Sequence, residues 1–242
     1  MRFNERRLFL KLGLIFAAIH LVLYLPVHIS YQEFFGDAGA GLQLALGIAV
    51  SFLGEVANFI LPIVAATVIF ISYAYNGAAH AMPRVLFSAL PYLVSAVPEN
   101  YLKYLAYTDS VGAIGFSLLI SLFTVLIFSV EVLALFGVMC IFCRVREGNG
   151  FSSLEADAMF DFSLPFTRAQ LFSCVTVFAI RFITEAVSTV SYIVAVAGAY
   201  RMREILTIVF TFLFITLLFV LSYVLAYRVK EKLLDNRLEI IE

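Results

Sequence analysis

Four ionisable side chains stand deep inside long apolar runs of this sequence, and they are the residues that could do chemistry. They are Glu55, Glu131, Arg181 and Glu185. An ionised side chain that faces lipid at the centre of a bilayer costs at least about 2.5 kcal/mol, so such residues are expected to face the interior of a helix bundle. There they either line a route for protons and ions or join helices through buried polar contacts.

The polar neighbours of these four residues follow helical spacing, which places each charge on a polar seam of its helix. The seams comprise Ser51, Glu55 and Asn58 in one run, Ser117, Ser121, Thr124 and Glu131 in a second, and Arg181, Thr184, Glu185, Ser188 and Tyr192 in a third. The candidate intramembrane site therefore consists of Glu55, Asn58, Glu131, Arg181 and Glu185.

Charge balance constrains what this intramembrane site can do. Arg181 and Glu185 lie four residues apart, so their side chains can meet on one face of a helix. Three glutamates nevertheless stand against one arginine, and at least one or two glutamates must be protonated, bind a cation, or meet water or a partner's cation. Two interpretations stay open, namely a transport pathway and a structural clamp or assembly contact.

The composition requires a lipid bilayer as the solvent for most of the surface. Hydrophobic residues make up 63% of the chain and charged residues 14%, whereas soluble domains are about 45–50% apolar and about a quarter charged. A single water-soluble core cannot bury that excess. The net charge of −1 gives no global basic field, which argues against nucleic acid as a partner.

Runs of about 20 apolar residues predict six transmembrane helices. They cover residues 8–29, 41–75, 84–107, 111–143, 169–200 and 205–226. The first is expected to be an uncleaved helix, because no small-residue cleavage motif follows its apolar centre. The third contains Pro91 and Pro98 and could instead lie in the membrane interface.

The distribution of basic residues decides between these topologies. With six spans, twelve Lys and Arg residues fall on the side of the two termini, and only Lys103, Arg201 and Arg203 fall on the other. If 84–107 did not span, the split would be eight against seven. The positive-inside rule therefore favours six spans with both termini cytoplasmic. The expected location is a bacterial plasma membrane.

Several of these runs are longer than a bilayer requires. At 1.5 Å per residue, a run of about 33 residues is roughly 50 Å long, against about 30 Å of hydrocarbon. Such helices must tilt, break or extend beyond the membrane, and Pro62 offers one kink point. We therefore predict an all-α polytopic membrane protein, a single transmembrane domain over residues 1–242, whose overlong helices extend into the cytoplasm.

The largest polar segment is the predicted cytoplasmic loop 144–168. Ser152 and Glu155 have the spacing of a capping box, which predicts a short amphipathic helix over residues 153–162. Leu154 and Phe162 fall on its apolar face. We expect this segment to dock a partner, with Leu154, Phe162, Pro165 and Arg168 as the candidate contacts.

The stretch "FDFSLPFTRAQLF" resembles a loop of the ABC-2 type exporter permeases. The matching residues are Ser163, Leu164, Pro165, Thr167 and Arg168, with Phe166 where the family has an aliphatic residue. Six spans with both termini inside are also similar to that family, and the resemblance implies that the loop abuts a separate ATPase subunit. The family places this motif between its second and third helices, whereas here it precedes the fifth.

The remaining motifs do not predict a catalytic or metal site. Cys140 and Cys143 have a C-x-x-C spacing but no second pair or adjacent histidine, so we interpret them as reduced, packed thiols. Asp157 and Asp161 form one D-x-x-x-D pair, which we interpret as a solvated helix face rather than a magnesium site. No metalloprotease, serine hydrolase or phosphate-binding motif is present in the sequence. We therefore expect neither an enzyme nor a cofactor.

These observations lead to one expected function and one alternative. The first is the membrane-spanning subunit of a transporter, an exporter permease that works with a separate ATPase because the chain has no P-loop of its own. The alternative is a non-catalytic structural or assembly subunit of a larger membrane complex. Expected partners are the bilayer and either an ATPase or other membrane subunits, and a homodimer is one arrangement that the sequence allows.

Overall fold

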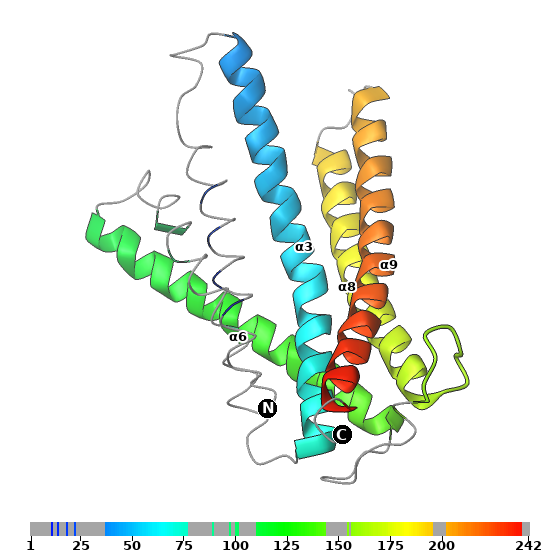
Figure 1. The fold of residues 1–242 in the computed structure, drawn as a ribbon. Coiled ribbons are helices and arrows are strands. Elements are labelled where there is room, and N and C mark those ends of the chain that lie inside the picture. Colours follow the sequence, from blue (N-terminus) through cyan, green and yellow to red (C-terminus); the bar gives the residue numbers. More distant parts are fainter. Residues whose placement is uncertain are drawn as a thin grey trace. The chain divides into compact units, whose positions relative to one another are not determined.

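The computed structural model describes residues 37–76, 110–143, 156–195 and 202–238, together with isolated residues at 11, 14, 18, 22, 89, 97, 100, 101 and 154. The described ranges form helices α3 (Asp37–Asn76), α6 (Ser110–Cys143), α8 (Pro165–Ala195) and α9 (Met202–Leu238) (Figure 1). Strands do not occur among these residues. The prediction of an all-helical chain is confirmed for this part of the protein.

Three of the described helices are long and apolar enough to cross a membrane. The qualifying segments are Val111–Cys143, Pro165–Thr184 and Val209–Asp235, and a shorter apolar stretch, Phe59–Ala74, lies within α3. These features are those of an integral membrane protein. The predicted spans 8–29 and 84–107 lie outside the described residues, apart from isolated positions, so the count of six stays a prediction.

The chain divides into two compact units, which are described separately. One comprises residues 1–58 and 78–134, and the other comprises residues 59–77 and 135–242. In the second unit α8 and α9 pack side by side and run in opposite directions (Figure 1). Their contact is rich in phenylalanine: the ring centroids of Phe182 and Phe212 are 4.6 Å apart, and those of Phe178 and Phe219 are 5.5 Å apart.

Helix α9 continues well beyond its apolar run. The sequence predicted an end at residue 226, but the helix extends to Leu238. The reason is a buried stripe at helical spacing that persists through the charged segment, and its members are Ser222, Tyr223, Ala226, Tyr227, Lys230, Leu233 and Leu234. Packing of this stripe stabilises the additional turns, because amphipathic burial rather than mean hydropathy decides where such a helix ends.

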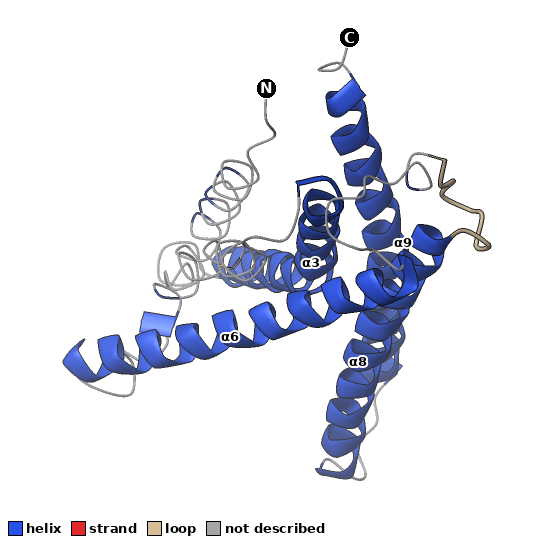
Figure 2. Cartoon of the chain, turned by 90° about the horizontal axis from the view of Figure 1, so that it is seen from below, coloured by secondary structure: helices blue, strands red, loops and turns tan. Residues whose placement is uncertain are grey.

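The loop before α8 differs from its prediction. Residues 156–164 form turns instead of the last part of a helix over 153–162 (Figure 2, tan). Main-chain bonds run from Asp161 N–H to Ala158 O at 3.2 Å and from Leu164 N–H to Asp161 O at 3.1 Å. Asp161 also bonds Ser163 through its side chain, and such local bonds compete with helix formation. Residues 152 and 155, on which the helix prediction rested, are outside the described residues.

In the first unit one face of α6 is buried. Ser117 is 1% exposed and its hydroxyl donates to Val97 O, while the Asn100 amide donates to Ser121 Oγ at 3.3 Å. Thr124, on the same predicted seam, is half-buried and donates to Ile120 O of its own helix at 3.1 Å. The seam at Ser117 and Ser121 therefore binds a neighbouring segment of its own unit.

Candidate functional site

The carboxylate of Asp157 caps the first turn of α8. The N–H groups of Phe166 and Thr167 donate to Asp157 Oδ2 at 3.0 and 3.4 Å. The helix begins with a bond from Arg168 N–H to Leu164 O at 3.0 Å, so the position that usually carries a capping side chain is occupied by leucine. Asp157 supplies the missing acceptor from the preceding loop, and its negative charge also suits the positive end of the helix dipole.

The second oxygen of the same carboxylate joins α9 to this cap. The Tyr227 hydroxyl donates to Asp157 Oδ1 at 2.8 Å, and the Thr167 hydroxyl contacts both Asp157 Oδ1 and the Tyr227 hydroxyl. Thr167 Oγ1 also lies 2.8 Å from Ala158 O. Asp157, Thr167 and Tyr227 are all buried, so one carboxylate connects the loop, α8 and α9 away from solvent.

A buried lysine completes the connection to α9. Lys230 is 2% exposed, and its Nζ donates to the main-chain oxygen of Asp157 at 2.8 Å. The same Nζ lies 5.0 Å from the ring centroids of Phe166 and Tyr227. A desolvated ammonium is costly, and the two aromatic faces, the carbonyl and the nearby Asp157 carboxylate together offset that cost.

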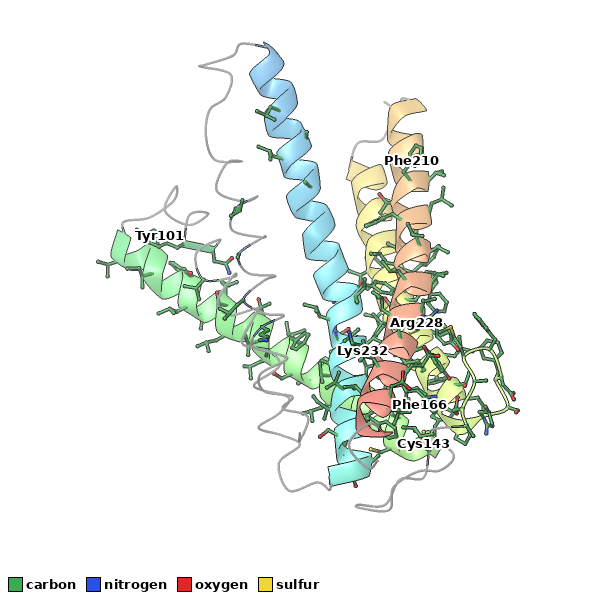
Figure 3. All side chains as sticks on the ribbon, viewed as in Figure 1. Tyr101, Cys143, Phe166, Phe210, Arg228 and Lys232 are labelled. Atoms are coloured by element: carbon green, nitrogen blue, oxygen red, sulfur yellow. The ribbon has the colours of Figure 1, made fainter. Side chains whose placement is uncertain are left out.

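The first turn of α8 also packs against the second half of α3 within this unit. The Phe166 ring stacks on Phe70 with centroids 5.8 Å apart, and its centroid is 5.6 Å from that of Tyr227. The Thr67 hydroxyl donates to Gln170 Oε1 at 3.1 Å, and both side chains are fully buried. In Figure 3 Phe166 lies in the same lower part of the α8–α9 pair as Arg228 and Lys232.

The outer side of the loop exposes apolar side chains. Phe160 is 73% exposed and Phe162 is 48% exposed, and the small residues Ala156 and Ala158 are exposed as well. The exposed rings belong to a loop whose inner side is fixed by buried hydrogen bonds. Preorganised apolar side chains of this kind are suited to contact another surface.

At the tip of the loop Asp161 forms a local turn with Ser163. Its Oδ1 accepts from the Ser163 hydroxyl at 2.6 Å and from the Ser163 N–H at 3.0 Å. These two bonds lower the pKa of Asp161 from its ordinary value, the hydroxyl bond being the larger cause. Since the pKa is lowered, the turn is stabilised above the ordinary pKa, and the stabilisation is lost as the pH falls through the lowered pKa.

We therefore expect the loop tip to loosen on acidification. Amide exchange at Ser163 and Leu164, corrected for intrinsic rates, should rise as the pH falls below the ordinary range of aspartate, at about 4. The Asp161→Asn variant is the matched control, because its amide does not titrate. An identical pH profile in the two proteins would contradict the assignment.

The predicted docking residues fall in different environments. Leu154 is buried at 1% exposure, whereas Phe162 and Arg168 are exposed. Pro165 and Arg168 line an open hollow of about 450 Å³ together with Ile141, Phe142 and Cys143. Leu154 and Phe162 therefore do not form one apolar face as predicted. Leu154 is packed inside the protein, and Phe162 is exposed and can contact a partner.

The predicted intramembrane residues lie on the expected helices. Glu131 on α6 and Arg181 on α8 are half-buried. Glu55 and Asn58 lie on α3 and Glu185 lies on α8, where the structure describes the helix but not these side chains. Because three of the five side chains lie outside the description, the intramembrane site stays a prediction.

The residues of α9 that build this site were not predicted from the sequence. Tyr223, Tyr227 and Lys230 have the spacing i, i+4, i+7, which places them on one helical face and could have indicated a buried seam. Asp157, interpreted as part of a solvated helix face, is instead buried and accepts hydrogen bonds from α8 and α9. Cys140 and Cys143 are free thiols, half-buried and buried respectively.

Comparison with known proteins found no protein family, no curated protein and no solved structure that matches this chain. These comparisons neither confirm nor contradict the resemblance of residues 163–168 to the exporter permeases.

Proposed function

We propose that this chain is the membrane-spanning subunit of a transporter, an exporter permease that works with a separate ATPase docking on loop 156–164. The observation that carries the proposal is the Asp157 cap. It fixes a loop with two exposed phenylalanines onto two helices that can each cross a membrane. A fixed contact point on membrane helices is what an external ATPase needs in order to move them.

The local sequence supports the same proposal. Residues Ser163–Arg168 carry the permease-like motif. Two of them, Phe166 and Thr167, donate their main-chain N–H groups to the Asp157 carboxylate that fixes the loop. The positive-inside distribution places this loop on the cytoplasmic side, where an ATPase would be found. In this proposal Glu55, Asn58, Glu131, Arg181 and Glu185 line the route of the transported molecule.

The test is whether the exposed phenylalanines retain an ATPase. The full chain with an affinity tag is purified in mild detergent from its own membrane, and ATP hydrolysis is measured in the purified sample. We expect the Phe160→Ser, Phe162→Ser double variant to lose about tenfold or more of the co-purified hydrolysis, because exposed aromatic anchors often dominate an interface. The yield of folded chain should not change, since neither ring is buried.

Ala156→Ser is the matched control, because it adds a hydroxyl at another exposed position of the same loop. It should retain the ATPase. Equal ATP hydrolysis in the double variant and the wild type would contradict docking at this loop. A wild-type sample that contains a stoichiometric membrane protein and no ATP hydrolysis would favour the structural or assembly subunit instead.

A further inference from the structure

Three side chains on one face of α9 donate hydrogen bonds to loop 156–164. Tyr223 donates to Met159 O, Tyr227 donates to Asp157 Oδ1, and Lys230 donates to Asp157 O. Two of these three bonds end on main-chain oxygens, so they fix the path of the loop whatever side chains it carries. The loop is therefore attached to residues of α9 that follow their loop partners by 64, 70 and 73 residues in the chain.

The tip of the loop has a different set of bonds. Among the described contacts, those of Asp161 and Ser163 stay within the loop, and both residues are exposed. Phe160 and Phe162 are exposed as well. Apart from the covalent link to α8 at Pro165, a force applied at the tip is therefore transmitted to the rest of the unit through Asp157, Ala158 and Met159.

From these three residues the force reaches α8 and α9 together. Asp157 bonds the first turn of α8 and also Tyr227 and Lys230 of α9. Farther along, the two helices are packed through Phe178 and Phe219. Close-packed elements joined at both places transmit displacement instead of absorbing it.

We propose that loop 156–164, the first turn of α8 and the Tyr223–Lys230 face of α9 form one rigid lever, through which a docked protein moves α9 directly and not only α8. The docking of an ATPase rests on the proposed function, whereas the lever is a property of this chain alone. The nearest covalent neighbour of the loop is α8, so sequence order alone would assign the movement to that helix.

The first test uses the isolated full chain in detergent and measures hydrogen exchange of amides in residues 156–167. The Tyr227→Phe, Lys230→Met double variant removes two of the three donors from α9 and keeps the size of both side chains. We expect exchange in residues 156–167 to rise about tenfold or more, because local opening is governed by the bonds that close the segment. Exchange in the second half of α8 should stay as in the wild type.

Lys232→Met is the matched control. It makes the same substitution two residues away on the same helix, at a lysine that is exposed, and it should leave exchange in residues 156–167 unchanged. Unchanged exchange in the double variant would show that α8 alone holds the loop and would overturn the lever. A rise spread equally over α8 and α9 would also overturn it, because it would indicate loss of the whole fold.

The second test adds the ATPase recovered with the wild-type chain. Binding should protect residues 156–164 in both proteins, but it should protect residues 223–230 only in the wild type. Protection of residues 223–230 in the double variant as well would overturn the lever. Absence of protection in both proteins would contradict ATPase docking, while the exchange measured on the isolated chain would still decide the lever.

Discussion

Replacing Asp157 with alanine should lower the free energy of unfolding by about 3–5 kcal/mol, the range seen when one partner of a buried charged network is removed. The change deletes the cap of α8 and leaves the N–H groups of Phe166 and Thr167 and the hydroxyl of Tyr227 without their acceptor. It also removes a negative charge that favours the ammonium of Lys230, a residue that is only 2% exposed. Each buried polar group left unsatisfied costs about 1–3 kcal/mol.

Asp157→Asn should cost less, about 1–2 kcal/mol, since an amide oxygen still accepts from the α8 N–H groups while its NH₂ group can donate to the neighbouring hydroxyls. The matched control is Asp161→Ala, four residues along the same loop, where the side chain is exposed and the change should leave the free energy of unfolding almost unchanged. Unfolding by denaturant in mixed micelles, followed by near-UV circular dichroism, measures all three. Equal losses for the alanine variants at positions 157 and 161 would show that the cap is not a major source of stability.

The membrane helices were predictable from the sequence because bilayer-crossing segments are defined by length and hydropathy alone. The predicted run 111–143 ends at Cys143, as α6 does. Helices α8 and α9 likewise enclose most of the predicted runs 169–200 and 205–226. Their ends were harder to predict because they depend on packing. Hydropathy at the end of α9 falls because of Arg228 and Lys232, which are exposed. Mean hydropathy does not reveal the buried face of the same turns, which includes Lys230.

The Asp157 network could not be predicted, since its bonds join residues that are far apart in sequence. Asp157 and Tyr227 are 70 residues apart, and Asp157 and Lys230 are 73 apart. The local pattern around Asp157 also predicted the wrong environment for it. An acidic residue four positions before another in a predicted helix favours a solvated helix face, and only the folded chain shows that the carboxylate of Asp157 caps the next helix. Pro165 was the available local signal, because proline favours the first position of a helix.

Removing the guanidinium from α8 is the second change from which we expect a large effect. Arg181 lies within the membrane-crossing segment Pro165–Thr184 and is half-buried, and Glu185 follows it by one helical turn. If the two side chains pair, Arg181→Ala leaves a carboxylate uncompensated in low dielectric, at a cost of about 3–5 kcal/mol. The double variant Arg181→Leu, Glu185→Leu removes both charges and should recover most of the folded yield, because apolar residues of similar size replace a buried ion pair at little cost.

The measurement is a double-mutant cycle, scored first by folded yield in size-exclusion chromatography and then by ATP hydrolysis of the co-purified complex. Thr184→Ala is a matched control on the same helix, because this exposed threonine donates to Ile180 O of its own helix at 2.7 Å, and it should leave the yield unchanged. A double variant that folds but no longer couples to the ATPase would assign Glu185 to the transport route as well as to the clamp. A double variant that folds no better than Arg181→Ala would show that Arg181 depends on a different partner, and Glu55 and Glu131 would be the next carboxylates to replace.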